Sequence, residues 1–375
     1  MNRFAVVCGL LLLAAMSSAG QTRNENGLPR RGWFGVALAP DDNGVVVTGV
    51  AVGSPAASAG IRVGDVIRTI DRAAVRTPED VIAAIGRRAG GATAAIDYMR
   101  TGEAHEASVV LRPFPYETMP EVKFEYGSVT LSDGIRLRTI VSMPDRRGPF
   151  PAVMLLQGGG CGSVDVPMAA DVGQPGLVRT IATRGYVTMR VEKSGVGDSE
   201  GPPCDAIGYS QELEGYGAAL AALKRHPSVD SDKIYLLGIS LGGVFAPILA
   251  GANPVRGIIV YGTPAAAPQP YPGRSERFFR EFAAVDVPAA WSAVDARVLS
   301  VYGEFDELVP RDHHVRIAEI VNARHPGRAI LKELEGLDHC WTQHDTREKS
   351  RGNCGKGAEV STLADAILRF LAATG

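Results

Sequence analysis

The sequence predicts two domains, a small β-rich domain followed by a larger α/β domain whose parallel sheet is covered by helices on both faces. Three observations support this expectation. The chain has 375 residues, about twice the length of a typical single domain. Short β-type runs broken by glycine and proline fill residues 31–115. From residue 122 to the end, apolar strand-like runs alternate with helical patterns, the order that gives a parallel sheet.

The composition is that of an ordinary globular protein and argues against two classes of partner. Hydrophobic residues make up 45% of the chain, charged residues make up 21%, and the formal net charge is −2. This charge balance gives no electrostatic basis for binding nucleic acid or an anionic membrane surface. We therefore expect no nucleic-acid partner.

The first twenty residues have the pattern of an export signal. A positively charged start, MNRF, precedes the apolar run AVVCGLLLLAA, and the small residues SSAG follow. The apolar run is too short to cross a bilayer comfortably, and no later run is long enough. We expect a signal peptide over residues 1–20, no integral membrane span and a secreted or periplasmic protein. A retained N-terminal anchor is the alternative.

The elements of the first domain follow one another in a short β-rich order. The segments RGWFGVAL (31–38) and GVVVTGVAVGSPAASAGIRVGDVIRTIDRAAV (44–75) contain short β-type runs that glycine and proline interrupt. Thr77 is a predicted helix N-cap, with Pro78 at the first helical position and acidic residues in the first turn. Residues 92–113 then predict a hairpin around the turn TGE.

Residues 31–115 resemble a PDZ domain. The matching residues are SPAASAGIRVGDVI (54–67), whose glycines and Asp65 fall at PDZ turns, and GWFGV (32–36). In that family the latter stretch holds the C-terminal carboxylate of a peptide, which then adds as a strand to the sheet edge. The resemblance implies a groove lined by Trp33, Phe34, Gly35 and Val36. The alternative is that this groove packs on the next domain and binds nothing.

The second domain begins with a predicted antiparallel hairpin and continues as alternating strands and helices. Its ligands should lie at the carboxyl ends of the parallel strands. The expected strands, some continuing into loops, are 124–131, 135–144, 151–160, 186–201, 233–240, 255–263, 296–310 and 329–339, and the expected helices are 176–185, 211–226, 241–251, 311–324 and 359–374.

A candidate nucleophile lies where one of these strands turns into a helix. Residues 238–242 read Gly-Ile-Ser-Leu-Gly, directly after the apolar run KIYLL. A nucleophile elbow needs small neighbours because its turn is strained and the helix packs close to the strand. The helix N-terminus also directs backbone N–H groups at the site. This context makes Ser240 the predicted nucleophile.

A serine needs a base that is itself oriented by an acid. Asp306 and His339 lie in loops after later strands, and the order Ser-Asp-His suits a triad at one sheet edge. Asp306 could instead cap the helix that begins near Arg311. The other histidines fit turns, loops, a helix or the first domain better than a catalytic base, so we expect His339 to be the base.

Attack on an acyl carbon also requires donors for the oxyanion that forms. One expected donor is the N–H of Leu241, and the other should come from the glycines of LLQGGGCG, with Gly159 preferred over Gly160. These glycines do not form a phosphate-binding loop, because both the Lys-Ser/Thr ending and the GxGxxG spacing are missing.

From residue 122 to the end, the sequence resembles the α/β-hydrolase fold of esterases and serine peptidases. Besides the Ser240 elbow, SGVGDSEG (194–201) and GEFDELVP (303–310) match loops of that family. One departure is Gln157, where many relatives carry histidine, which affects the expected oxyanion geometry. Residues 263–294 are long enough only for a small helical cap. We therefore expect an α/β-hydrolase domain at 122–375 behind the PDZ-like domain.

The cysteines predict disulfides in an exported chain. Without Cys8 of the signal peptide, four cysteines remain, and four cysteines allow three pairings. Cys161–Cys204 and Cys340–Cys354 are favoured because each pair would tie down a loop beside a candidate catalytic element. Four reduced thiols remain the alternative, and no metal-binding spacing is present in the sequence.

Together these features predict a secreted serine hydrolase that acts on a small-molecule ester or a peptide through an acyl-enzyme, without a cofactor. The triad serves both bond types, so the substrate stays open. One rival is a peptide-binding adaptor with an idle hydrolase half, and another is thiol redox chemistry, which lacks a CxxC pair.

Overall fold

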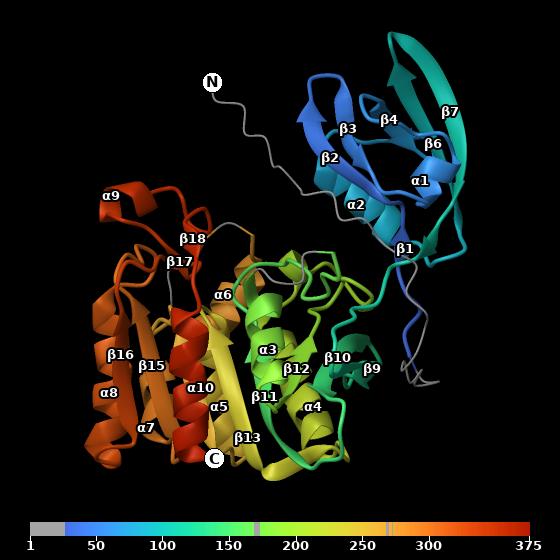
Figure 1. Cartoon of the computed structure of the whole chain (residues 1–375). Coiled ribbons are helices and arrows are strands. Elements are labelled where there is room, and N and C mark those ends of the chain that lie inside the picture. Colours follow the sequence, from blue (N-terminus) through green and yellow to red (C-terminus); the bar gives the residue numbers. More distant parts are fainter. Residues whose placement is uncertain (1–26, 169–172, 268–269, 272) are drawn as a thin grey trace. The chain divides into compact units, whose positions relative to one another are not determined.

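A computed structural model describes residues 27–168, 173–267, 270–271 and 273–375 (Figure 1). The predicted signal peptide, residues 1–20, lies outside the described residues. Most of the described chain forms two compact units, Pro29–Tyr116 and Glu117–Gly375. Every helix in the described part of the chain is too short or too polar to cross a bilayer.

The first unit is a small antiparallel sheet with two short helices. The sheet order is β2-β3-β4-β6-β7, with β5 beside β4, and β1 pairs separately with β8. Helix α2 begins as expected, because Thr77 and Asp80 form a capping box around Pro78. The elements are β1 Gly32–Trp33, β2 Val36–Asp41, β3 Gly44–Val50, α1 Pro55–Ser58, β4 Val66–Ile70, β5 Ala73–Ala74, α2 Pro78–Gly86, β6 Thr93–Arg100, β7 Glu103–Val110 and β8 Arg112–Pro113.

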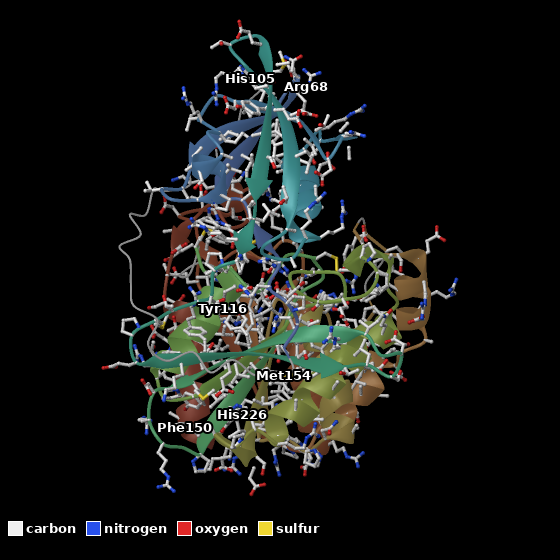
Figure 2. The ribbon with its side chains drawn as sticks, turned by 90° about the vertical axis from the view of Figure 1, so that its right-hand side faces the viewer. Arg68, His105, Tyr116, Phe150, Met154 and His226 are labelled. Carbon is white, nitrogen blue, oxygen red and sulfur yellow. A yellow bond between two sulfur atoms is a disulfide. The ribbon has the colours of Figure 1, made fainter. Side chains whose placement is uncertain are left out.

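The second unit is built on an eight-stranded sheet in the order β16-β15-β14-β13-β11-β12-β10-β9. The pairs from β12 to β16 are parallel, and the hairpin β9–β10 adds antiparallel strands at the edge. Figure 2 labels Phe150 and Met154 on the central strand β11. The strands are β9 Val122–Thr130, β10 Arg136–Pro144, β11 Phe150–Leu156, β12 Val187–Val191, β13 Val229–Ile239, β14 Gly257–Tyr261, β15 Arg297–Gly303 and β16 Ala329–Leu334, with the small pair β17 Thr342–Gln343 and β18 Ala358–Glu359 apart from the sheet.

Helices cover both faces of this sheet, and each face has its own hydrophobic core (Figure 1). Residues of α4, α5, α7 and α8 contribute to one core, and residues of α3 and α10 contribute to the other. Burial on both faces explains why the central strands are almost continuously apolar. The helices are α3 Gly173–Thr183, α4 Tyr209–Lys224, α5 Gly242–Ala252, α6 Glu276–Ala283, α7 Val287–Ser292, α8 Arg311–Arg324, α9 Arg347–Ser350 and α10 Thr362–Thr374, with a short 3₁₀ turn, η1, at Cys204–Ala206.

In the segment 263–294, expected to be a small cap, the two helices pack into the hydrophobic core. These helices are α6 and α7, and α7 contacts α5 and α8. Trp291 on α7 is fully buried, and Phe278 and Phe282 on α6 are buried in the same core. These aromatic side chains therefore stabilise the helical layer.

Candidate active site

Ser240 lies on a sharp turn between β13 and α5, as the elbow pattern predicted. Its backbone φ is +52°, a left-handed conformation that is rare for a residue other than glycine. The two glycines of the motif are needed for space: a Cβ at Gly238 would overlap Gly243 of the helix, and a Cβ at Gly242 would overlap the Leu156 carbonyl of β11. Strained backbone at such a turn is typical of functional sites.

The neighbouring strand β14 holds this turn in place. The Ser240 N–H donates to the Tyr261 carbonyl at 2.8 Å, and the Thr263 hydroxyl donates to the Ser240 carbonyl at 3.1 Å. Within the described residues, the Ser240 hydroxyl itself has no hydrogen-bond partner. The strained peptide is thus fixed while Oγ stays free.

The structure brings Asp306 and His339 together. Asp306 Oδ2 lies 2.8 Å from His339 Nδ1, and Asp306 is only 2% exposed. Its other oxygen accepts the N–H groups of Leu308 and Val309, both at 2.9 Å. Asp306 does not cap α8, whose N-cap is Pro310. A buried carboxylate in this position fixes the orientation of the imidazole.

Gly262 connects the Asp306–His339 pair with Ser240. It follows Tyr261, which binds the Ser240 N–H, and a Cβ at Gly262 would lie 2.8 Å from His339 Nδ1 and 3.0 Å from Asp306 Oδ2. The end of β14 therefore touches both the serine turn and the histidine pair. Gly262 could not be identified from the sequence, because nothing in its neighbouring residues indicates this close approach.

The glycine loop after β11 lies beside the nucleophile. A Cβ at Gly158 would be 3.5 Å from the Ser240 Cβ. Among the described residues we find no acceptor for the N–H of Gly159 or of Leu241. Both predicted oxyanion donors are thus unpaired, and Gly159 also lies against the hydroxyl of Tyr271.

A buried lysine that no sequence motif indicates, Lys193, holds this loop from the other side. Lys193 Nζ donates to the carbonyls of Gly158 at 2.5 Å and Gly160 at 2.9 Å. It also lies 3.0 Å from Glu212, which forms a second ion pair with Arg274. Burial and, less strongly, the charge of Arg274 lower the pKa of Lys193. Two of the three donors of an ammonium group are thus used by the loop carbonyls, and Glu212 adds an ion pair.

Gln157 braces the same loop, so its departure from the family pattern has a structural explanation. Its side-chain amide donates to the Gly162 carbonyl at 2.6 Å. Its N–H donates to the Tyr216 hydroxyl at 3.1 Å.

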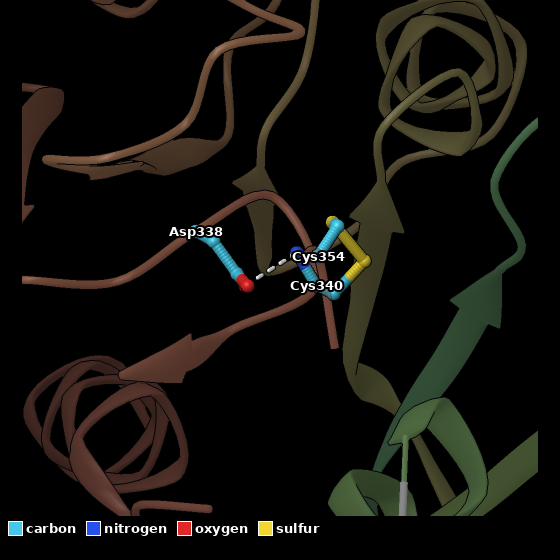
Figure 3. A group of neighbouring side chains, drawn as sticks. All are labelled: Asp338, Cys340 and Cys354. Atoms are coloured by element: carbon cyan, nitrogen blue, oxygen red, sulfur yellow. Dashed lines mark hydrogen bonds between the residues drawn. A yellow bond between two sulfur atoms is a disulfide. The ribbon is translucent and has the colours of Figure 1, made fainter. Parts of the chain in front are cut away.

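The four cysteines form the pairs favoured from the sequence, Cys161–Cys204 and Cys340–Cys354. The first joins the end of the glycine loop to the 3₁₀ turn before α4, and the second closes the loop that follows His339. Figure 3 shows Asp338 beside the second pair, with ligand atoms within 4.8 Å of one another. Because the two sulfur atoms are bonded to each other, this group is a cross-link and not a thiolate metal site.

Asp338 organises the histidine loop. Its carboxylate accepts the N–H groups of Cys340 and Thr342 at 2.9 Å and the N–H of Gly355 at 3.0 Å. It also lies 2.8 Å from His344 Nε2. Burial alone would raise the pKa of Asp338, but its hydrogen bonds, led by those from Thr342 and His344, outweigh burial and lower the pKa.

The other histidines lie in structural roles. His226 pairs with Glu125 at 3.0 Å near the start of β11, close to Phe150 in Figure 2 and at the opposite end of that strand from the glycine loop. His313 accepts the Ala265 N–H at 3.0 Å. Buried His314 lies 3.2 Å from the Ser300 hydroxyl, and burial lowers its pKa to about 4.

In the first unit, the predicted peptide loop lies between β1 and β2. Strand β2 is an edge strand of its sheet, and α2 packs beside it. Gly35 has a φ of +84°, and within the described chain the N–H groups of Phe34 and Gly35 have no acceptor. Phe34 is buried, whereas Trp33 and Val36 are partly exposed.

Comparison with known proteins supports both folds. Residues 32–111 match the PDZ domain family, and residues 133–271 match the X-Pro dipeptidyl-peptidase (S15) family. Solved structures similar to the chain include DcsB, with a TM-score of 0.53, and Est1E from Butyrivibrio proteoclasticus, with a TM-score of 0.51. Each is 18% identical to this chain. The DcsB match covers 68% of this chain and all of DcsB, and the Est1E match covers 66% of this chain and 98% of Est1E. The predicted combination of a PDZ domain and an α/β-hydrolase fold is therefore confirmed.

Similarity to curated proteins divides between the two units. The magnetosome formation protease MamE of Magnetospirillum gryphiswaldense is 40% identical over 74 residues, which are 20% of this chain and 10% of MamE. Esterase EstD of Thermotoga maritima is 25% identical over 125 residues, or 33% of this chain and 30% of EstD. The "Probable periplasmic serine endoprotease DegP-like" of Brucella suis is 29% identical over 28% of this chain and 24% of its own length. The chain thus spans less than a third of each of these relatives.

Proposed function

We propose that the protein is a serine hydrolase in which Ser240, His339 and Asp306 form the catalytic triad. The observation that carries the proposal is the arrangement around the end of β14. Gly262 touches the His339–Asp306 pair, while the preceding residue, Tyr261, binds the backbone of the strained Ser240 turn. Acyl transfer requires a nucleophile, an oriented base and unpaired backbone donors, and these lie at one edge of the sheet.

In the proposed mechanism, Ser240 Oγ attacks the carbonyl carbon while its proton passes to His339 Nε2. Asp306 accepts the hydrogen bond from Nδ1–H and stabilises the imidazolium. The N–H groups of Leu241 and Gly159 bind the oxyanion, with Gly160 as the second choice for the loop donor. The leaving alcohol or amine takes the proton from His339. A water molecule then attacks the acyl-Ser240 ester and gives its proton to His339, which returns the proton to Ser240 Oγ as the carboxylic acid leaves.

The comparisons support an ester or a peptide bond as the target. The S15 match includes Ser240 and the glycine loop but ends before Asp306 and His339. Among the relatives, EstD is named an esterase, and Est1E is described with bound ferulic acid. We propose a small-molecule ester or a peptide as substrate and no cofactor, because every step uses the chain's own residues and water.

The PDZ domain would tether a peptide C-terminus to this hydrolase. A carboxylate would accept the free N–H groups of Phe34 and Gly35 in the loop from Trp33 to Val36, and the peptide would pair with the open edge of β2. Location outside the cytoplasm fits this proposal. The two disulfides persist in oxidising compartments, and a related protein is named as periplasmic.

The test compares three substrates: p-nitrophenyl butyrate, a quenched fluorescent peptide with a free C-terminus, and the same peptide with a C-terminal amide. We expect hydrolysis of the ester or the peptides, and Ser240→Ala should lower kcat/KM at least about a thousandfold. Faster cleavage of the free-acid peptide would support tethering. A folded, oxidised protein that binds the free-acid peptide but hydrolyses none of the three would favour the adaptor function instead.

A further inference from the structure

We propose that Lys193 is a positioning residue that aims the backbone N–H of Gly159 at the oxyanion, an inference that rests on the proposed hydrolase function. The key contact is between Lys193 Nζ and the Gly158 carbonyl, at 2.5 Å. Lys193 lies beyond the end of β12 and does not belong to the glycine loop or to the triad.

Peptide geometry links this carbonyl to the oxyanion donor. The Gly158 carbonyl and the Gly159 N–H belong to one planar peptide unit, and the only cis peptide among the described residues is Gly148–Pro149. In a trans unit the C=O and N–H bonds point in opposite directions. A carbonyl held by Lys193 therefore directs the Gly159 N–H away from Lys193.

The strand order shows where that N–H then points. Strand β11, which leads into the glycine loop, lies between β12 and β13. Lys193 follows β12, and Ser240 follows β13, so the lysine and the nucleophile lie on opposite sides of the loop. Turning the N–H away from Lys193 directs it towards the side of Ser240, whose Cβ lies 3.5 Å from the Cβ position of Gly158.

The loop depends on this external contact. Glycines have no side chains to fix their peptide planes, and each can rotate more freely than other residues. Lys193 also binds the Gly160 carbonyl at 2.9 Å, so it fixes two alternate peptide units, and Cys161 at the end of the loop is anchored to Cys204. An oxyanion donor is effective only when it is preorganised.

Either Lys193 or Arg274 can be replaced without leaving Glu212 unpaired. Glu212 pairs with both Lys193 and Arg274, so removing either cation leaves one cation with one carboxylate. Lys193 is 3% exposed and Arg274 is 8% exposed. Of the two, only Lys193 contacts the loop carbonyls, whereas Arg274 contacts the Cys204 carbonyl and both sulfur atoms of the Cys161–Cys204 disulfide. Lys193→Met and Arg274→Met are therefore a matched pair.

The experiment measures kcat and KM for an activated ester per active site, with sites counted by stoichiometric labelling of Ser240. Lys193→Met should lower kcat by about a hundredfold, the loss typical of one oxyanion donor, while KM changes less than about threefold. Arg274→Met should stay within about threefold of wild type. An aryl trifluoromethyl ketone, which forms a tetrahedral adduct, should lose affinity for the Lys193→Met protein by a factor similar to the loss in kcat.

Two outcomes would overturn the proposal: a kcat for Lys193→Met within about threefold of wild type, or an equal loss in Arg274→Met. If Lys193→Met does not fold, Lys193→Gln is measured in its place. The glutamine side chain is shorter than lysine but keeps two N–H donors. This variant should show an intermediate loss in kcat, and an unchanged kcat would again refute the proposal. A wild-type protein without turnover or labelling would instead refute the hydrolase function.

Discussion

At the scale of single residues, the candidate site contains two kinds of residue. Some can be identified from sequence motifs, and others become apparent only from their contacts in the folded chain. Ser240, Asp306 and His339 could be chosen from the sequence because each has a characteristic neighbourhood, and the structure pairs the last two at 2.8 Å. Gly262 and Lys193 could not be chosen, because their importance lies in contacts with residues distant in the chain.

Gly262→Ala should lower kcat/KM by about a hundredfold or more, because a Cβ at 2.8 Å from His339 Nδ1 displaces the imidazole. The φ of +57° adds strain of about 1–3 kcal/mol. The matched control is Gly327→Ala, since Gly327 has a φ of +78° and no atom within 4 Å of its Cβ position. Equal activity losses in the two variants would mean that backbone strain, and not contact with His339, is responsible.

At the scale of elements, the sequence predicted the alternation of strands and helices well. Helix α8 occupies Arg311–Arg324, the range expected from its pattern. The region after β16 was harder, because β17, α9 and β18 contain only two to four residues each and are held by Asp338 and a disulfide. Such short elements are specified by long-range contacts and leave no periodic signal.

Asp338→Asn should destabilise this loop by about 2–3 kcal/mol, because several donors lose a charged acceptor. The pKa of Asp338 is lowered below 3.8 in the folded protein. Its stabilising contribution is therefore complete above about pH 4 and is lost as the pH falls through the lowered pKa. Thermal unfolding from pH 7 to pH 3 should show a smaller acid-induced loss in the variant than in wild type.

Asp345→Asn is the control for that measurement. Asp345 lies in the same loop but is exposed, and its ion pair with Lys349 is on the surface. It should leave the melting temperature nearly unchanged, because exposed ion pairs contribute little. A shift as large as that of Asp338→Asn would show that loop charge in general, and not the Asp338 contacts, sets the stability.

At the scale of the whole molecule, the chain combines a PDZ domain with an α/β-hydrolase fold, and the comparisons confirm both. The strand pattern predicted two domains, and the two folds could be named because SPAASAGIRVGDVI (54–67) resembles the PDZ family and Gly-Ile-Ser-Leu-Gly (238–242) the α/β-hydrolase family. The substrate could not be predicted, because a Ser-His-Asp triad serves esters and peptides alike. The predicted cap gave no further guidance, since α7 packs into the helical layer between α5 and α8.

The central claim is that Ser240 is an activated nucleophile. The most direct test is to incubate the purified, oxidised protein with a fluorophosphonate probe and to map the adduct by peptide mass spectrometry. We predict one adduct, on Ser240, that is absent in Ser240→Ala and forms far more slowly in His339→Gln. A folded wild-type protein that remains unlabelled, or that carries the adduct on another residue, would contradict the account.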